Sequence, residues 1–253
     1  MATKKQPSFS IPIKKAGADP TAQYHRMCVT ALTGAGKTVL GTTAPRPLIM
    51  VAESISKPTI QAFNPEAYVI EVTSRDEIMK VLEWARSSEE ARHFATLVVD
   101  SATECGEILK KWVVENSPTR AKMEAMGKFN VLTLDDWGTY YSELDRMMRM
   151  FTTLPMHTLC LAQAFEQVDE VSRARFLRPN FEGSKFPPRF PGYFSLSGVL
   201  ERVPSADGKS VERRVVFDTP GSMYLTKTAK GLDDVEPANV ARWIEKLNAA
   251  KKK

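Results

Sequence analysis

Eight consecutive residues, Ala31 to Thr38, constrain the fold of this chain more than any other segment. They read Ala-Leu-Thr-Gly-Ala-Gly-Lys-Thr, which departs from the phosphate-binding pattern G-x-x-x-x-G-K-[ST] only at the first glycine. The apolar run Met27–Thr30 precedes them, and helix-compatible residues, Val39–Gly41, follow. Because a phosphate loop of this type lies between a strand and a helix, the segment predicts an α/β fold with a phosphate site.

Each position of this loop has an expected role. Gly34 and Gly36 let backbone N–H groups close around a phosphate chain at a helix N-terminus. Lys37 is expected to reach the β- and γ-phosphates, and Thr38 to hold Mg²⁺. Ala31 requires an ordinary φ where the first glycine usually lies, so the turn is expected to close slightly differently. With ATP and Mg²⁺ as cofactors, the expected nucleotide-binding residues are Thr33, Gly34, Ala35, Gly36, Lys37, Thr38 and Val39.

Length and composition fit one such domain. The 253 residues are 43% hydrophobic, and no stretch approaches the roughly 20 apolar residues of a membrane span. The N-terminus has no apolar segment of the kind found in secretory signals. Three cysteines, Cys28, Cys105 and Cys160, lie far apart without a C-x-x-C pair, which argues against a disulfide or zinc framework. We therefore expect a reduced, cytoplasmic protein that does not bind membranes.

The net charge of +5 comes from the two ends of the chain. The tails contribute seven lysines, namely Lys4, Lys5, Lys14, Lys15, Lys251, Lys252 and Lys253. Residues 19–250 are left with a net charge of −2. Solvated tails are the simpler interpretation, and a dedicated contact is the alternative. Within the body, positive charge is concentrated in residues 172–214, which hold nine Lys or Arg against four acids.

The hydrophobic pattern divides the chain into three parts. Residues 1–22 are polar and contain several prolines, and they predict a flexible basic arm. Residues 23–235 predict an ATPase-type core, and residues 236–253 predict a C-terminal helix and basic tail. As far as residue 163, strands alternate with helices, which is typical of a mainly parallel sheet covered by helices in three layers.

Individual elements can be predicted within these parts. Strands are expected over Tyr24–Thr30, Leu48–Ala52, Tyr68–Val72, Thr96–Val99 and Thr158–Ala162. Helices are expected from a Ser74–Glu77 capping box to Arg86, from Asp100 to Glu115, over Asp135–Phe151, and over Pro237–Leu247 with Pro237 in the first turn. Residues 116–134 predict a loop or weak helix. An antiparallel hairpin is expected from Leu196–Val203, the Asp207-Gly208 turn and Val211–Phe217.

Polar residues follow the expected strands at the edge where parallel sheets bind ligands. Glu53, Asp100 and Gln163 end the second, third and fourth strands that form this edge. Thr-Leu-Val-Val ending in Asp100 is the Walker B form, whose carboxylate holds the Mg²⁺ shell directly or through water. Glu53 is the expected base that orients water against the γ-phosphate, because Ser101 follows Asp100 where other ATPases carry a carboxylate. The alternatives are that Asp100 only caps the following helix, and that Glu53 and Gln163 are ordinary polar residues at strand ends.

This arrangement resembles the RecA recombinase family, in which a glutamate occupies the place of Glu53. There, a glutamine at the place of Gln163 senses the γ-phosphate and couples it to DNA. The chain is more specifically similar to the phage RecA-like ATPases, short single-core relatives encoded near single-strand annealing proteins. The resemblance covers roughly residues 24–230. It rests on the phosphate loop followed by Thr-Ala-Pro-Arg-Pro-Leu, the strand ending in Glu53, Val-Val-Asp-Ser, Asp136-Trp137-Gly138 and a late Phe-Pro-Gly-Tyr.

The chain departs from this family at two places. One is Ala31, and the other is Ser54-Ile55, where many relatives carry two glycines. The second departure affects the loop around Glu53, the expected catalytic base, more than Glu53 itself.

The resemblance implies a Mg²⁺-dependent ATP hydrolase in which Lys37, Glu53 and Gln163 serve hydrolysis while Thr38 and Asp100 hold the metal. It also implies single-stranded DNA binding, a role in recombination or annealing, and assembly into a homo-oligomer. A single-strand annealing or single-strand binding protein is the implied protein partner. In such oligomers a neighbour's Lys or Arg completes the site; the candidates here are Lys227 and Lys230, with ordinary exposed lysines as the alternative.

The resemblance also implies that residues 164–192 form a DNA-contacting loop. Its basic residues are interleaved with Phe165, Phe176, Phe181, Phe186 and Phe190. Positive charge follows a phosphate backbone, and aromatic faces stack on unpaired bases at ~1–3 kcal/mol each. Alternatively, the phenylalanines pack a subdomain or an interface. A second candidate loop, residues 116–128, is basic but lacks aromatics. The expected nucleic-acid residues are Arg173, Arg175, Phe176, Arg178, Lys185 and Arg189.

Two other functions stay open at this point. An ATP-gated interaction module with little hydrolysis, which docks a replication or annealing protein, is compatible with Ala31 and with the altered sequence after Glu53. A small-molecule phosphotransferase fits less well, because no arginine-rich lid is evident. Three dispersed histidines lack metal-ligand spacing, and the absence of G-x-S-x-G leaves a hydrolase triad without support.

Overall fold

A computed structural model describes residues 23–168, 175–205, 207–218 and 226–251 of the chain. Its strands are β1 (Arg26–Ala31), β2 (Pro47–Val51), β3 (Tyr68–Glu71), β4 (Thr96–Asp100), β5 (His157–Val168), β6 (Arg175–Pro179), β7 (Leu196–Pro204), β8 (Val211–Val216) and β9 (Val235–Pro237). Its helices are α1 (Lys37–Thr42), α2 (Lys57–Phe63), α3 (Arg75–Ser87), α4 (Ala102–Glu115), α5 (Arg120–Ala125), α6 (Asp136–Thr152) and α7 (Val240–Lys251). Short 3₁₀ helices are η3 (Ser54–Ser56), η4 (Glu90–His93) and η5 (Phe190–Tyr193). The expected arm, residues 1–22, lies outside the described residues.

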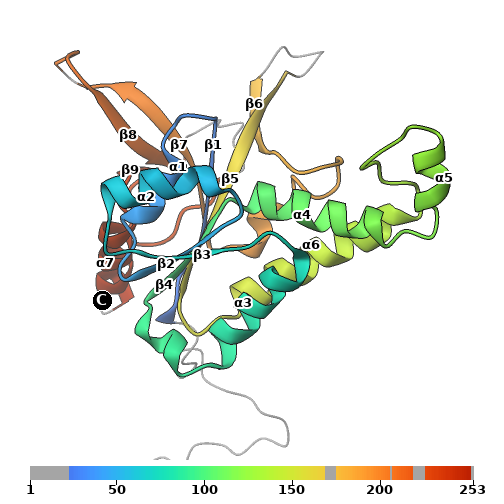
Figure 1. Cartoon of the computed structure of the whole chain (residues 1–253). Helices are drawn as coiled ribbons and strands as arrows, with labels where there is room; N and C mark the ends of the chain where they lie inside the picture. The colour runs from blue at the N-terminus through green and yellow to red at the C-terminus, as the bar shows by residue number, and fades with distance from the viewer. Residues whose placement is uncertain (1–22, 169–174, 206, 219–225, 252–253) are drawn as a thin grey trace, which may run out of the picture.

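Over the described residues, nine strands form one sheet in the order β3-β2-β4-β5-β1-β7-β8-β9, with β6 paired to β5 outside this path. The ladders from β3 to β7 are parallel, whereas β6, β8 and β9 join antiparallel. Helices α1, α2 and α7 cover one face, and α3, α4 and α6 cover the other (Figure 1). The predicted three-layer α/β fold with a mainly parallel sheet, a hairpin and a C-terminal helix is confirmed.

The central strands are apolar on both faces because both faces are covered by helices. Since successive side chains of a strand point to opposite faces, Val99 and Cys160 pack toward α3, α4 and α6, while Val98 and Leu159 pack toward α1 and α7. The aromatic and methionine side chains of α6, among them Tyr140, Met147 and Phe151, lie in the first of these cores. The three cysteines are buried and free. Among the helices that the structure describes, none is long and apolar enough to cross a membrane.

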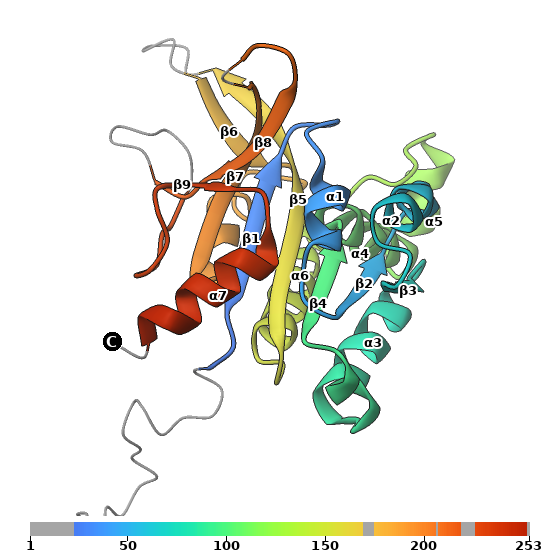
Figure 2. The ribbon, with the colours of Figure 1, turned by 90° about the vertical axis from the view of Figure 1, so that its left-hand side faces the viewer.

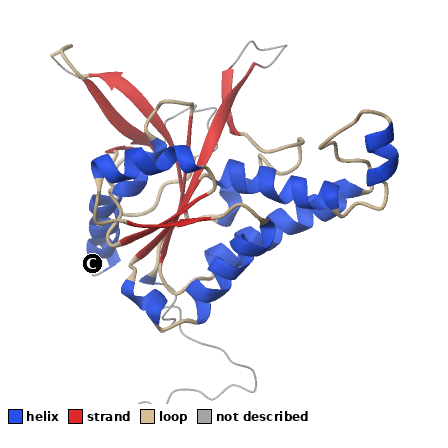
Figure 3. Cartoon of the chain, viewed as in Figure 1, coloured by secondary structure: helices blue, strands red, loops and turns tan. Residues whose placement is uncertain are grey.

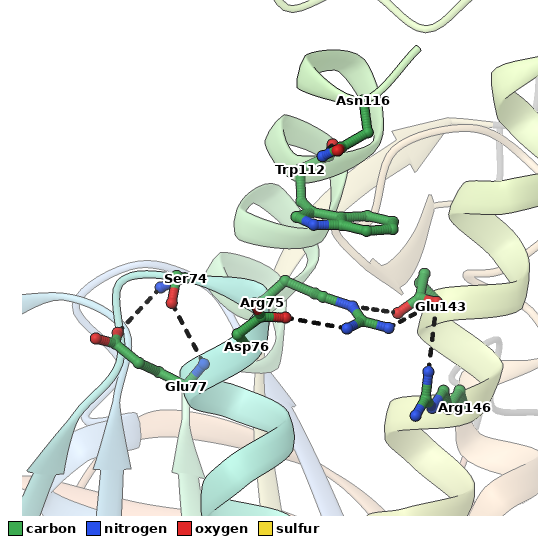
Figure 4. Close-up of polar contacts among 8 residues, drawn as sticks. All are labelled: Ser74, Arg75, Asp76, Glu77, Trp112, Asn116, Glu143 and Arg146. Atoms are coloured by element: carbon green, nitrogen blue, oxygen red, sulfur yellow. Dashed lines mark hydrogen bonds and ion pairs between the residues drawn. The ribbon is translucent and has the colours of Figure 1, made fainter.

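The predicted capping box begins α3 (Figure 4). The Ser74 hydroxyl accepts a hydrogen bond from the Glu77 N–H (3.3 Å), and the Glu77 carboxylate accepts one from the Ser74 N–H (3.2 Å). Arg75 follows the cap, donates to Glu143 of α6 through Nε (2.9 Å), and places its guanidinium over the Trp112 ring of α4, 4.6 Å from the ring centre. The start of α3 therefore ties the three helices of this layer together.

The fourth parallel strand does not end at Gln163, as the sequence had suggested. β5 continues to Val168, although its parallel ladder with β1 ends at the Ala31–Gln163 pair. From Ala164 onward it pairs instead with β6, so β5 and β6 form a two-stranded ribbon. This ribbon and the β7–β8 hairpin extend beyond the helical layers at the same end of the molecule (Figure 3). The loop expected after Gln163 therefore begins as a hairpin.

Pro237 does not lie in the first turn of the C-terminal helix, and that prediction is wrong. It is the last residue of β9, and α7 begins at Val240. The cap is supplied by Asn239, whose side-chain oxygen accepts from the Arg242 N–H (3.0 Å). The Pro237 carbonyl accepts a hydrogen bond from the Trp243 indole (2.8 Å), which anchors the helix to the edge of the sheet.

Candidate active site

The phosphate loop joins β1 to α1 at the carboxyl end of the parallel strands. Its backbone turns through Gly34 (φ 78°) and Gly36 (φ 105°), left-handed conformations that favour glycine. A Cβ atom on Gly34 would have no atom within 4 Å, so the loop is open at that position. Ala31 stays within β1, and the turn needs no positive φ where the usual first glycine is missing.

Thr38 and Asp100 lie together beneath this loop. The Thr38 hydroxyl donates to the Asp100 carboxylate (2.7 Å), and Asp100 is only 4% exposed. Burial raises the pKa of Asp100, while hydrogen bonds from Thr38 and Ser56 and the charge of Lys37 oppose that rise. A buried carboxylate beside a threonine hydroxyl is an oxygen donor set suited to Mg²⁺, which these two residues would hold.

Lys37 is the first residue of α1 and is half-buried. Burial lowers the pKa of its ammonium group, and the charges of Asp100 and Glu53 oppose that shift. The ammonium thus lies in the field of both predicted acidic site residues, one from β4 and one from the residues that follow β2. Such a cation is placed to meet the negative charge of a phosphate chain.

Glu53 lies exposed at the start of η3, beyond the carboxyl end of β2. Its carboxylate interacts with Glu104, one turn into α4, which the sequence analysis did not single out. Burial, a hydrogen bond with Glu53 and the charge of Glu53 raise the pKa of Glu104 to about 7. Burial and the neighbouring Glu53 carboxylate therefore favour the neutral form of Glu104, whose carboxyl group can donate a hydrogen bond to Glu53.

Gln163 lies directly beside the phosphate loop. Its side-chain amide donates to the Thr33 hydroxyl (2.9 Å), and its own N–H donates to the Thr103 hydroxyl of α4 (2.9 Å). Its carbonyl accepts from the Asn180 N–H (2.7 Å), just after β6. Gln163 therefore contacts the phosphate loop, the helix after β4 and the base of the β5–β6 ribbon.

These residues fit a nucleotide with Mg²⁺. The open glycine loop, the half-buried Lys37 and the Thr38–Asp100 pair come together from β1, α1 and β4. No group of three or more His, Cys, Asp or Glu side chains within the described residues could hold a metal by itself.

Comparison with known proteins agrees with this geometry. A family model described as AAA domain matches residues 23–229. The chain belongs to the AAA domain family. The match supports a P-loop ATPase with nucleotide-dependent activity. Among solved structures, the chain is similar to a KaiC-like protein from the hyperthermophilic archaeon Pyrococcus horikoshii OT3, at 12% identity, over 76% of this chain and 77% of that chain, with a TM-score of 0.35. An identity and a TM-score this low assign no function to the chain. No curated protein sequence matches.

The described residues among those expected to bind nucleic acid lie on and after the β5–β6 ribbon of this AAA domain. Arg173 is outside the described residues, and only the backbone of Arg175 and Phe176 is described, in β6. Arg178 pairs in register with Phe165 across the ribbon. Lys185 is exposed, and Arg189 lies 3.7 Å from Asp145 while keeping 59% of its side chain exposed. Their role in binding nucleic acid stays a prediction.

The phenylalanines that follow the ribbon do not form a stacking surface. Phe181, Phe186 and Phe190 are 6%, 1% and 0% exposed and contact one another with ring centres 4.9–6.2 Å apart. They join the core between the sheet and α4 and α6. The expectation that these three rings stack on bases is therefore wrong, and the packing alternative applies to them. Phe165, on the ribbon, is 37% exposed.

The two lysines proposed to act in a neighbouring subunit lie at the amino end of the sheet, away from the phosphate loop of their own chain. Lys227 forms a bridge with Ser197 at the start of β7, and its ammonium donates to the Phe194 carbonyl (2.8 Å). Lys230 is exposed. Action in a neighbouring subunit stays a prediction for both.

Sequence reasoning missed two residues of the AAA domain site. No local sequence signal marked Glu104, because its interaction with Glu53 joins α4 to the segment that follows β2. Arg213 of β8 donates through Nε to the Ala35 carbonyl of the phosphate loop (3.2 Å). The only signal for Arg213 was the positive charge concentrated in residues 172–214, because its contact depends on how the hairpin folds over the loop.

Proposed function

We propose that this chain is a Mg²⁺-dependent ATPase that binds single-stranded DNA and assists phage-type homologous recombination or strand annealing in the host cytoplasm. The single observation that carries the proposal is the position of Gln163. It contacts the phosphate loop at Thr33 and the base of the β5–β6 ribbon at Asn180. A change at the phosphate loop would thus reach the strand pair proposed to contact DNA through one residue, whose side chain contacts Thr33 and whose backbone carbonyl contacts Asn180.

The chemistry assigns each residue of the site a task. Lys37 and the amides of the phosphate loop bind the phosphate chain. Thr38 and Asp100 hold Mg²⁺, which neutralises the charge of the β- and γ-phosphates when bound. Glu53 orients a water molecule and accepts its proton, and the protonated Glu104 keeps the Glu53 carboxylate in place. Positioning and charge, rather than covalent chemistry, account for hydrolysis at such a site.

The coupling to DNA follows from the two partners of Gln163. With ATP bound, the Gln163 amide turns from Thr33 toward the γ-phosphate, and the ribbon shifts with it. That state holds single-stranded DNA on the exposed face of the ribbon, where Phe165 offers an aromatic surface and basic residues offer charge. Hydrolysis through Glu53 returns Gln163 to Thr33 and releases the strand. A homo-oligomer and an annealing or single-strand binding protein as partner belong to the same proposal.

The test measures Mg²⁺-ATP hydrolysis with and without single-stranded DNA, at low and at moderate salt. The proposal expects strong stimulation that fades as the salt concentration rises, because phosphate contacts release counterions. Lys37→Ala is expected to abolish hydrolysis. Gln163→Ala is expected to keep nucleotide affinity but to lose the ATP-dependent change in DNA affinity, whereas Gln61→Ala, on exposed α2, leaves both unchanged.

Two results would contradict the DNA role. If ATP does not change the affinity for DNA in the unmodified protein, the coupling through Gln163 is wrong. If hydrolysis is slow and equal with and without DNA, and ATP-loaded protein retains a replication or annealing protein, the chain is the ATP-gated interaction module instead. Transfer of phosphate to a nucleoside or metabolite would identify a phosphotransferase.

A further inference from the structure

Arg213 reaches the phosphate loop from β8, a strand that supplies none of the other site residues. Its Nε donates to the Ala35 carbonyl (3.2 Å), and a Cβ atom on Gly36 would lie 2.5 Å from the same nitrogen. The backbone of Arg213 is fixed on both sides, since it pairs with Arg202 of β7 and its carbonyl accepts from the Ala238 N–H (3.1 Å). The guanidinium is therefore held against the loop by a well-anchored hairpin.

The partners of Arg213 do not account for its charge. Within the described residues, its terminal NH₂ groups have no hydrogen bond and no ion pair, and its one partner is a neutral carbonyl. The charge of the next residue, Arg214, is by contrast neutralised on this hairpin by an ion pair with Glu201 of the neighbouring strand, at 3.2 Å. Arg213 instead adds a second cation to a loop that already presents Lys37. Two cations at one loop repel each other unless an anion lies between them.

The sheet order indicates which part of a nucleotide Arg213 would meet. Glu53, Asp100 and Gln163 come from β2, β4 and β5, all on one side of β1. Arg213 comes from β8, on the other side of β1 (Figure 2). The proposed metal, base and γ-phosphate contact therefore occupy one flank of the loop. The opposite flank, where Arg213 lies, is left for the end of the phosphate chain that carries the nucleoside.

We propose that Arg213 binds the α-phosphate of the nucleotide, and that the β7–β8 hairpin supplies this cation within the same chain. The inference rests on the proposed nucleotide function but not on the DNA role. An α-phosphate contact is present with ADP as well as ATP, so it strengthens binding of both without favouring the transition state. Loss of the guanidinium should raise KM and leave kcat close to its original value.

The test measures the affinity of Mg²⁺-ADP and of a non-hydrolysable Mg²⁺-ATP analogue for the intact protein by calorimetry. Arg213→Gln is expected to weaken both about tenfold, since a charge-assisted hydrogen bond to phosphate is lost at a partly exposed site. Arg213→Lys, which keeps the charge but not the fork, should recover part of the affinity. Arg214→Gln, one residue along the same strand, is the matched control and should bind both nucleotides normally.

Inorganic pyrophosphate separates a direct contact from a merely structural one. It has no α-phosphate equivalent once it fills the β and γ positions, so Arg213→Gln should bind it as the unmodified protein does. A parallel loss of pyrophosphate affinity would mean that Arg213 only shapes the loop through Ala35, and would overturn the proposal. Unchanged ADP affinity, or a loss confined to kcat, would overturn it as well.

The recombination role and the Arg213 contact can be contradicted separately. Unmodified protein that binds nucleotide but shows no DNA-stimulated hydrolysis contradicts the recombination role and leaves the Arg213 comparison fully measurable. Unmodified protein that binds neither ADP nor the ATP analogue contradicts both.

Discussion

Glu53 is the residue on which hydrolysis depends most directly in the proposed mechanism. Glu53→Gln keeps the shape of the side chain but removes the group that accepts a proton, so kcat is expected to fall about 10²–10⁴-fold. Nucleotide affinity should change little, because Thr38, Asp100 and the phosphate loop are untouched. Steady-state turnover and equilibrium binding measured on the same preparation check both statements. Glu66→Gln, an exposed carboxylate outside the site, is the control. Turnover at the original rate would remove Glu53 from the catalytic role.

Glu104 predicts a pH dependence of stability. Its pKa is raised from 4.5 to about 7 by burial and by its hydrogen bond and charge interaction with Glu53, so folding favours the protonated form. This contribution is complete below the unfolded pKa and is lost as the pH rises through about 7. Glu104→Gln stays neutral, so its melting temperature relative to the original protein should improve between pH 5 and pH 8. Because Glu104 is partly exposed, we expect about 2 °C. Thermal unfolding across this range checks the sign, and a constant difference would contradict the raised pKa of Glu104.

At the scale of elements, the segment after the β5–β6 ribbon separates core aromatics from surface aromatics. Phe186 is 1% exposed among Phe181, Phe190 and Tyr193, so Phe186→Ala should lower the free energy of unfolding by about 3–5 kcal/mol. Phe165, exposed on the ribbon, is its matched counterpart. Phe165→Ala should leave stability nearly unchanged and weaken single-stranded DNA binding by ~1–3 kcal/mol. Denaturant unfolding and DNA titration of both variants check this. Weaker DNA binding without a loss of stability in Phe186→Ala would mean that the buried rings do contact DNA.

The same segment marks how far the sequence predicts this fold. Local signals were sufficient where one motif determines one element. The Ser74–Glu77 capping box, the Thr96–Asp100 strand and the Asp207-Gly208 turn each lie where they were expected. Which strands pair with one another could not be predicted from local sequence. β5 continues past Gln163 because β6 replaces β1 as its neighbour, and Pro237 ends β9 because β8 offers an edge.

The residues of the candidate site also fall into those that the sequence predicted and those that it did not. Lys37, Thr38, Asp100 and Gln163 follow from strand ends and a loop motif, so their proximity could be predicted. Glu104 and Arg213 could not, because each reaches the site from an element whose orientation is set by tertiary packing. The interleaving of Phe and Arg after residue 164 predicted a DNA surface, but the burial of three rings depends on the space between α4, α6 and the sheet.

At the scale of the whole molecule, the site joins segments that are far apart in the chain. Its residues lie at the carboxyl ends of β1, β2, β4 and β5 or in the segments that follow these strands. Unfolding any one of these strands therefore destroys the site. Nucleotide binding should therefore raise the stability of the entire sheet rather than of one loop. A ligand that binds only the folded state, present at 100 times its dissociation constant, contributes about 2.7 kcal/mol. For a chain of this size that corresponds to an increase in melting temperature of about 5–10 °C.

Thermal unfolding with a non-hydrolysable Mg²⁺-ATP analogue, followed by both far-ultraviolet and tryptophan signals, measures this increase. The two signals should shift together, because Trp84, Trp112 and Trp137 pack on one face of the sheet and Trp243 on the other. Removing Mg²⁺ with a chelator should reduce the increase, because Thr38 and Asp100 would contact the phosphates only through the metal, and without it the Asp100 carboxylate repels them. Lys37→Ala should abolish it, whereas Lys57→Ala, an exposed lysine paired with Glu71, should retain it. An increase that survives in Lys37→Ala would mean that the nucleotide does not depend on the phosphate-loop lysine, and would contradict the site assigned to it.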